Sequence, residues 1–210
     1  MKEPTRGTPD ARGLRIALLR SQFNAPVVEG LVSGAREALR AMGAQKRDVV
    51  VVDVPGAFEL PLAARAAAES ERFDAIVALG AVIRGETDHY EHIAREAASG
   101  LAAVARRTRV PVGFGVLTVA EEAQALARSA PGPENKGGEA ARAAVAMVHV
   151  LARMKPATPD TARRGRAQRT EERKRSRRPA GDSTTGESAR KGGSSAARGG
   201  AGTRRRKAAS

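Results

Sequence analysis

The chain has 210 residues and a formal net charge of +14, and it contains no Cys. This length suits one substantial domain or two small ones, and the lack of Cys excludes disulfides and thiol catalysis. No segment is apolar over enough residues to span a bilayer, and the first residues lack the apolar core of a signal peptide, so we expect a cytoplasmic protein.

Apolar runs typical of buried strands alternate with helical patterns along most of the chain. Strands are predicted over residues 14–19, 48–54, 74–83 and 110–119. Helical spacing of apolar residues predicts helices over residues 27–43, 57–70, 89–107, 120–129 and 137–154. The second strand, "DVVVVDV", is continuously apolar and β-branched at its centre, as expected for a strand covered on both faces. The alternation predicts an α/β fold of three layers, α/β/α, around a four-stranded parallel, flavodoxin-like sheet.

Polar and aromatic residues follow three successive strands of this predicted sheet. "SQFN" with Phe23 follows the first strand, "VPGAFELP" with Phe58 and Glu59 the second, and "RGETDH" the third. Ligands of open parallel sheets bind outside the carboxyl ends of the strands, and aromatic faces there stack on planar ligands. The alternative is that both aromatic side chains only cap the sheet edge.

The segment "RGETDH" leads directly into the helix predicted from His89. The first N–H groups of a helix have no partner within it, and its dipole favours an anion. Gly85 allows a close backbone approach, and Thr87 or Asp88 suits the N-cap. The pattern therefore indicates a phosphate cradle with a titratable histidine at its rim, or alternatively an ordinary cap followed by a surface histidine.

The sequence carries no recognisable metal or nucleotide motif. His89 and His92 lie three residues apart on one helical face, but no third ligand is evident, so no metal site is predicted. The dinucleotide, P-loop and nucleophile-elbow patterns are all missing from the sequence.

The last quarter of the chain differs sharply in composition from the rest. Residues 155–210 hold 17 Lys and Arg against 5 Asp and Glu, which leaves a net charge of +2 for residues 1–154. With almost no large apolar side chains, residues 156–210 are predicted to be a disordered basic tail, and residues 1–12 a flexible N-terminus. Such a tail is either a solvated extension or a nonspecific, salt-sensitive binder of polyanions such as nucleic acid.

Residues 14–154 resemble the 6,7-dimethyl-8-ribityllumazine synthase family. The resemblance rests on six segments that follow one another in the family's order: "SQFN", "VPGAFELPLAA", "DAIVALGAVIRGETDHYEHI", "FGVLT", "QALAR" and "NKGGEAA". It implies a catalytic domain over residues 13–155 and the penultimate step of riboflavin synthesis. In that step, 5-amino-6-(D-ribitylamino)uracil condenses with 3,4-dihydroxy-2-butanone 4-phosphate, and phosphate and water leave. The resemblance implies no metal and no organic cofactor.

The resemblance also implies a role for individual residues. His89 matches the proton donor. The residues that match the ribitylaminouracil site are Phe23, Ala57, Phe58, Glu59, Ala81, Val82, Ile83 and Phe114. The residues that match the phosphate site for the second substrate are Gly85, Glu86, Thr87, Arg128 and Lys136. In the family, Phe114 and Arg128 belong to the neighbouring subunit.

Members of this family form pentamers, and many assemble into hollow shells of 60 subunits, so the resemblance implies a homo-oligomer of either kind. Two other functions remain open. One is a catalytically idle shell whose tail binds polyanions. The other is a lumazine- or riboflavin-binding protein, although such a carrier would not need the phosphate-site residues.

Overall fold

The computed structural model describes residues 9–154. The elements in chain order are β1 (Ile16–Ser21), α1 (Ala25–Ala41), a 3-10 turn η1 (Lys46–Asp48), β2 (Val49–Val54), α2 (Leu60–Glu69), β3 (Ala75–Ile83), α3 (His89–Thr108), β4 (Val112–Val119), α4 (Glu122–Ser129) and α5 (Lys136–Met154). The predicted disordered tail, residues 156–210, lies outside the described residues. So do residues 1–8 of the predicted flexible N-terminus, whereas Ala11 is buried and its N–H donates to the Met42 carbonyl at 2.8 Å.

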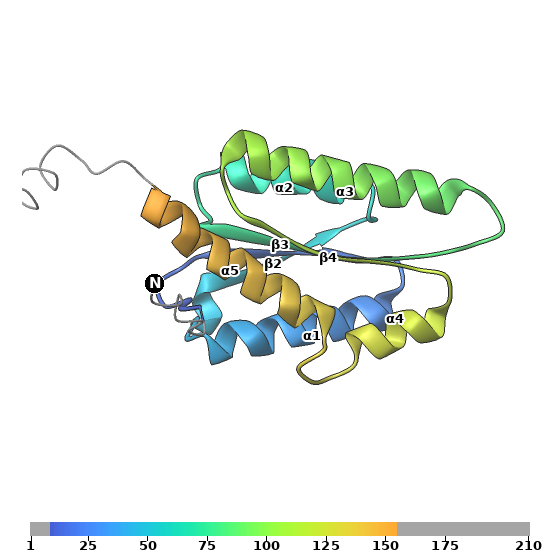
Figure 1. The fold of residues 1–210 in the computed structure, drawn as a ribbon, viewed down its shortest axis with the longest axis horizontal. Coiled ribbons are helices and arrows are strands. Elements are labelled where there is room, and N and C mark those ends of the chain that lie inside the picture. The colour runs from blue at the N-terminus through green and yellow to red at the C-terminus, as the bar shows by residue number, and fades with distance from the viewer. Residues whose placement is uncertain (1–8, 155–210) are drawn as a thin grey trace, which may run out of the picture. The chain divides into compact units, whose positions relative to one another are not determined.

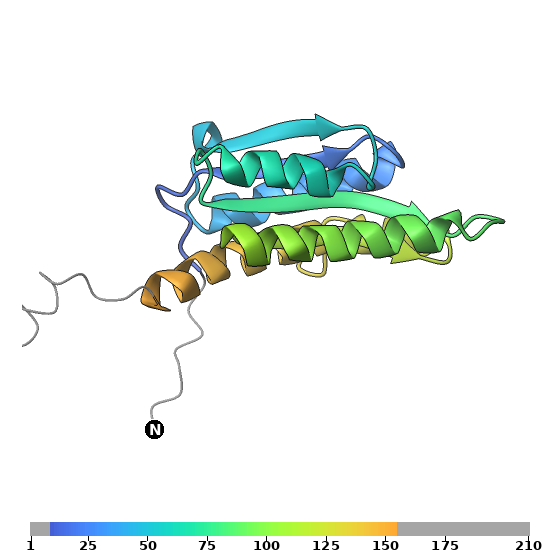
Figure 2. The same ribbon diagram turned by 90° about the horizontal axis from the view of Figure 1, so that it is seen from above.

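The four strands form one parallel sheet in the order β2-β1-β3-β4. Helices α2 and α3 lie on one face of this sheet, and α1, α4 and α5 lie on the other (Figure 1). Figure 2 shows the α2 and α3 layer from above, with the two helices running along the strands. The predicted three-layer α/β fold with a four-stranded parallel, flavodoxin-like sheet is confirmed.

The central strands are apolar throughout because both of their faces are covered. In β1, Ile16 and Leu18 pack into the cluster formed with α1, α4 and α5. Ala17 and Leu19 alternate with them and pack against α2 and α3, where Leu101 is also buried. Strand β3 is buried along almost its whole length for the same reason. The predicted strands and helices are all present, with ends that differ by up to three residues.

The edge strand β2 departs from the prediction. Val50 and Val52 are 36% and 39% exposed, because α2 packs against β1 and β3 and leaves this face of β2 open. The expectation that residues 48–54 form a strand covered on both faces is therefore wrong for the chain by itself. The apolar run correctly predicts a strand, but the position of that strand at the sheet edge decides how exposed its side chains are.

Arg20 links the carboxyl ends of β1 and β2 to α1. Its Nε donates to Asp53 Oδ1 at 2.6 Å, and its Nη1 donates to Glu29 Oε1, also at 2.6 Å. The hydrogen bond to Asp53 raises the pKa of Arg20 and lowers the pKa of Asp53. This ion-pair network holds together the end of the sheet from which the polar loops emerge.

Candidate active site

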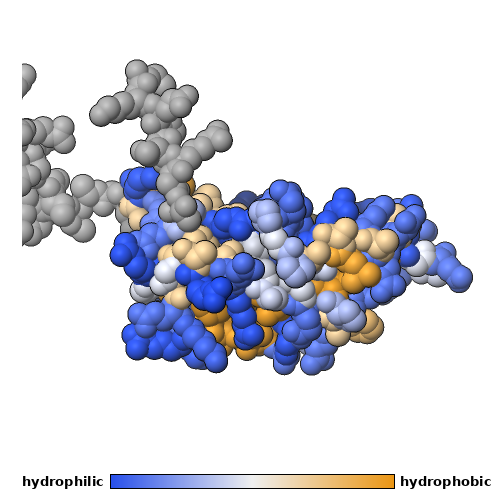
Figure 3. All heavy atoms as spheres, turned by 90° about the horizontal axis from the view of Figure 1, so that it is seen from below, coloured by the Kyte–Doolittle hydropathy of each residue, from blue (hydrophilic) through white to orange (hydrophobic). Residues whose placement is uncertain are grey.

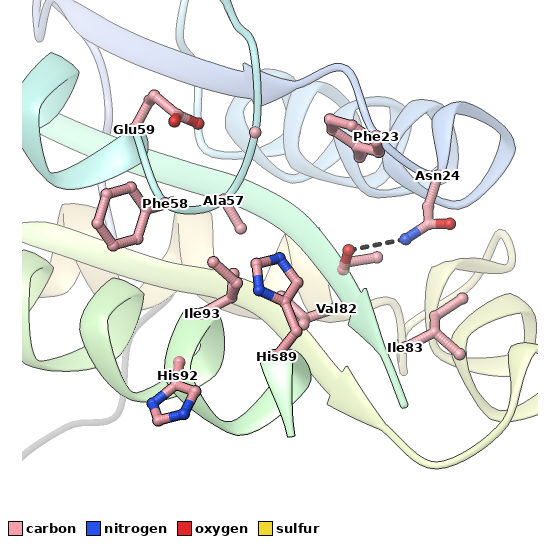
Figure 4. A pocket seen from close by; sticks show the side chains of 12 residues that line it. Phe23, Asn24, Ala57, Phe58, Glu59, Val82, Ile83, His89, His92 and Ile93 are labelled. Carbon is pink, nitrogen blue, oxygen red and sulfur yellow. Dashed lines mark hydrogen bonds between the residues drawn. The ribbon is translucent and has the colours of Figure 1, made fainter. Parts of the chain in front are cut away.

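A cavity of about 620 Å³ opens at the carboxyl ends of β1, β2 and β3. Four segments supply its walls: the loops after β1 and β2, the end of β3 and the first turns of α3 (Figure 4). The lining residues are Phe23, Asn24, Gly56, Ala57, Phe58, Glu59, Ala81, Val82, Ile83, His89, His92 and Ile93. The cavity lies where the topology of an open parallel sheet places a ligand site.

The loop between β1 and α1 places Phe23 on the cavity wall. Asn24 follows in the left-handed region, with φ 55° and ψ 47°, a conformation that Asn tolerates better than most residues. Its Nδ2 donates to the Ala81 carbonyl at 2.9 Å, so the loop is tied to the end of β3 (Figure 4). The Phe23 side chain remains 71% exposed, which leaves its ring free to stack on a planar ligand.

The loop between β2 and α2 brings a carboxylate and a second aromatic ring to the same cavity. Phe58 is 55% exposed, and Glu59 occupies the N-cap position of α2 without capping it through its side chain. A Cβ added at Gly56 would lie 2.9 Å from Glu59 Oε2 and 3.6 Å from the Phe23 ring. Glycine at this position therefore keeps the space between the carboxylate and the ring open.

His89 is the first residue of α3, and its exposed imidazole lies among the other labelled side chains of the cavity (Figure 4). Asp88 takes the N-cap position of α3, where the carbonyl oxygen of Asp88 accepts hydrogen bonds from Glu91 and His92. Asp88 is one of the two residues predicted for this cap, although its side chain makes no capping hydrogen bond. His89 thus combines a titratable side chain with a position at the positive end of a helix dipole.

The predicted phosphate cradle is an exposed loop beside this cavity. Gly85, Glu86 and Thr87 lie between β3 and α3 and do not line the cavity. Among residues 9–154, no acceptor is found for the backbone N–H groups of these three residues. A Cβ at Gly85 would meet no atom within 4 Å, so the backbone there is open to close approach. Free N–H groups next to a helix start are suited to binding an anion.

The other predicted residues line a second cavity, of about 230 Å³, on β4. Phe114, Arg128 and Lys136 contribute to it, together with residues 115–119. It has no lining residue in common with the first cavity. Arg128 Nη1 donates to the Gln124 carbonyl at 3.0 Å, and Lys136 Nζ donates to Glu139 Oε2 at 2.5 Å. The structure therefore divides the predicted site residues of one chain into two groups, those in or beside the first cavity and those that line the second.

Two comparisons with known proteins bear on the family of this chain. Residues 13–152 match the family model described as 6,7-dimethyl-8-ribityllumazine synthase. The chain belongs to this family. It is also 49% identical over 142 residues to a 6,7-dimethyl-8-ribityllumazine synthase of Nitrosomonas europaea, an alignment that covers 68% of this chain and 84% of the relative. The family expected from the sequence motifs is confirmed, and with it the condensation reaction of riboflavin biosynthesis.

Four residues of the first cavity are not among those predicted for the site: Asn24, Gly56, His92 and Ile93. Gly56 lies inside the quoted segment "VPGAFELP", where a glycine indicates that other groups approach the backbone closely. His92 and Ile93 follow from His89 by helical spacing, since residues three and four apart share a face. His92 and His89 belong to no group of three or more potential metal ligands among residues 9–154.

Proposed function

We propose that the cavity at the ends of β1, β2 and β3 is the site where lumazine synthase chemistry takes place in this chain. The observation that carries the proposal is the convergence of eight predicted residues, from two loops, a strand end and a helix start, on one cavity of about 620 Å³. Phe23 would stack on the pyrimidine ring, and the Glu59 carboxylate would accept hydrogen bonds from the ribityl chain. Ala57, Phe58 and residues 81–83 would form the apolar walls and offer main-chain hydrogen bonds.

His89 is proposed to move protons during the condensation. The amine of ribitylaminouracil attacks the ketone of the second substrate and forms an imine with loss of water. Phosphate is then eliminated, and ring closure releases a second water molecule. Each step transfers protons, and an exposed imidazole can both donate and accept them. Holding two substrates in contact supplies a large further part of the rate.

The phosphate of the second substrate is proposed to bind to Gly85, Glu86 and Thr87 together with Arg128 and Lys136. The loop contributes free N–H groups, and the two cations contribute charge. Because Arg128 and Lys136 line a cavity that shares no residue with the first one, we propose that each complete site combines the first cavity of one subunit, with the loop beside it, and the second cavity, including Phe114, of its neighbour. A pentamer or a shell of 60 subunits would provide such contacts.

Exposed apolar side chains support this proposal of an oligomer. Large apolar residues with at least 44% exposure occur outside the first cavity at Leu62, Phe114, Leu126, Met147 and Met154. On the α1 and α4 side of the molecule, apolar residues gather in patches among polar ones (Figure 3). Patches of this kind are typical of surfaces that contact other proteins.

The direct test is to mix the purified protein with both substrates and to follow the fluorescence of lumazine. Wild-type protein should form product, and His89→Ala should bind lumazine while losing much of the rate. An equal rate for His89→Ala would exclude His89 as the proton donor. No product from a folded wild-type oligomer that still binds lumazine would favour the carrier or idle-shell function instead.

We also propose that the basic segment 156–210 binds polyanions without sequence preference, on the basis of its charge alone. A filter-binding assay with and without this segment, at two salt concentrations, tests it, and binding that does not respond to salt would contradict the electrostatic account. Among residues 9–154, no helix is long and apolar enough to cross a membrane. The cytoplasmic location and the domain limits 13–155 stay predictions.

A further inference from the structure

Asn135 lies at the junction of three helices and is only 3% exposed. Its side-chain oxygen accepts hydrogen bonds from the N–H groups of Gly137 and Gly138, at 2.9 and 3.1 Å, and so caps the start of α5. Its Nδ2 donates to the carbonyls of Ser129 and Ala130, at 2.7 and 3.0 Å, just after α4. The same nitrogen donates to the Gly30 carbonyl of α1 at 3.1 Å.

The orientation of this amide is fixed by its surroundings. Turning the amide over would place an oxygen against three carbonyl groups and an NH₂ group against two N–H donors. The surrounding backbone also leaves little room for movement, since a Cβ added at Gly34 of α1 would overlap the Asn135 side chain. Every polar atom of this buried side chain is therefore used, and its position is determined from three sides.

The groups held by Asn135 are direct neighbours of the two cations in the second cavity. Ser129, whose carbonyl it binds, follows Arg128, and Lys136 lies between Asn135 itself and the N–H group of Gly137. The N–H and C=O groups of one amide side chain thus connect the end of α4, which carries Arg128, to the start of α5, which carries Lys136. This connection therefore lies directly beside both cations in the chain.

We propose that Asn135 is the positioning residue of the phosphate half-site, setting Arg128 and Lys136 relative to each other without contacting the substrate itself. The inference rests on the proposed function in one respect, namely that these two cations bind the phosphate of the second substrate. An arginine fork and an ammonium group bind one phosphate well only when both reach it in the same geometry. Losing the connection should therefore weaken phosphate binding and leave the pyrimidine site, on β1, β2 and β3, nearly unchanged.

The test compares two variants of the full chain. Asn135→Asp keeps the shape and the capping oxygen but removes the donors and adds a negative charge, and Asn135→Ser keeps only an uncharged capping hydroxyl, so an effect shared by both variants is due to the lost donors. The dissociation constant of inorganic phosphate is measured by calorimetry, and KM is measured for each substrate. We expect both the phosphate dissociation constant and KM for the butanone phosphate to rise roughly ten- to a hundredfold, the range that a small misplacement of a binding group causes. KM for ribitylaminouracil should change by less than about threefold, because that site lies on other loops.

Two controls separate positioning from general damage. Leu39→Ala removes a buried side chain from the other end of α1, 1% exposed, and should leave phosphate binding intact although it destabilises the fold. In an Arg128→Ala background, Asn135→Asp should weaken phosphate binding much less than in the wild type, because the group that it positions is gone. Additive effects, or a loss of phosphate binding in Leu39→Ala equal to that in Asn135→Asp, would overturn the inference.

The outcome for Asn135 is distinguishable from that for the proposed function. Wild-type protein that forms no lumazine would refute the function, while the comparison of phosphate binding between wild type and variants would still decide the role of Asn135. Wild-type protein that forms lumazine, with unchanged phosphate binding in both Asn135 variants, would refute the positioning role alone. Should Asn135→Asp fail to fold, Asn135→Ser carries the same comparison, because serine is a good N-cap residue.

Discussion

Asn24 provides a sharp test of how the wall of the first cavity is built. Its backbone is left-handed, at φ 55°, and its amide donates to the Ala81 carbonyl at 2.9 Å. The two features call for different side-chain properties. Glycine satisfies the backbone but has no amide, and alanine satisfies neither requirement. Asn24→Gly and Asn24→Ala therefore separate the contribution of the hydrogen bond from that of the backbone conformation.

The expected losses follow from these two features. Removing the partly buried hydrogen bond should cost about 1 kcal/mol of unfolding free energy in either variant. Asn24→Ala should cost about 1–2 kcal/mol more than Asn24→Gly, because glycine has no Cβ to meet the following carbonyl, and alanine lacks the short polar side chain by which asparagine tolerates the left-handed conformation. Both variants should also bind lumazine more weakly, since the adjacent Phe23 is no longer tied to the end of β3.

Urea denaturation at one fixed protein concentration gives the unfolding free energies, because the stability of an oligomer depends on subunit concentration. Fluorescence titration gives the lumazine affinity. Equal stability of the Gly and Ala variants would reject the argument from the left-handed backbone. Unchanged stability in both would reject the hydrogen bond as a stabilising contact, and unchanged lumazine affinity would reject the link to Phe23.

Three further changes test other features of the fold. Gly56→Ala should weaken lumazine binding, measured by fluorescence titration, at unchanged thermal stability, because the added methyl group would lie 2.9 Å from Glu59 Oε2. Unchanged lumazine affinity would contradict this. Ser21→Ala should leave the free energy of unfolding unchanged or raise it by about 1 kcal/mol, because the buried Ser21 hydroxyl has no hydrogen-bond partner among residues 9–154. A clearly lower free energy of unfolding, measured by urea denaturation, would contradict this. Hydrogen bonds from Arg12 lower the pKa of Asp10 to about 2, so the stability that this pair contributes should be lost as the pH falls from 3.8 through about 2. In Arg12→Ala, the pKa of Asp10 measured by NMR titration should rise toward 3.8, and an unchanged pKa would contradict this cause.

Much of the fold could be predicted from the sequence because local pattern and final environment agree. The apolar run of residues 74–83 forms β3, which is buried on both faces, and the helical spacing after His89 forms α3. Gly43, the last residue of the predicted helix 27–43, lies just beyond α1 with φ +90°. β2 is the exception, because exposure at a sheet edge depends on which strands the helices cover, and that follows from the three-dimensional arrangement alone.

The candidate site was predictable to the extent that it follows from the strand ends. Parallel strands bring the loops after β1, β2 and β3 to one edge of the sheet, so Phe23, Glu59 and His89 meet whatever the details of their loops. Asn24 escaped prediction because its role depends on a left-handed backbone and on the distance to a carbonyl 57 residues away. Asn135 escaped for the same reason, since the carbonyls that it binds include one on α1, 105 residues distant.

The separation of His89 and Arg128 into two cavities leads to a prediction about mixed oligomers. If each complete site takes its first cavity from one subunit and its second from the neighbour, His89→Ala subunits still offer an intact second cavity. Arg128→Ala subunits likewise offer an intact first cavity. Random assembly of equal amounts of the two variants should then restore about a quarter of the sites, since each site needs one particular subunit at each of two positions.

Co-expression of the two variants with different tags, followed by tandem purification and the lumazine assay, measures this recovery. Each variant purified alone should have little activity, so a rise to about a quarter of the wild-type rate is readily seen against either parent. Mixing the two variants after purification, without dissociating them, serves as the control and should give only the mean of the parents. Activity in the co-expressed oligomer that does not exceed this mean would show that the two cavities serve one site within a single subunit, or that they do not act together at all.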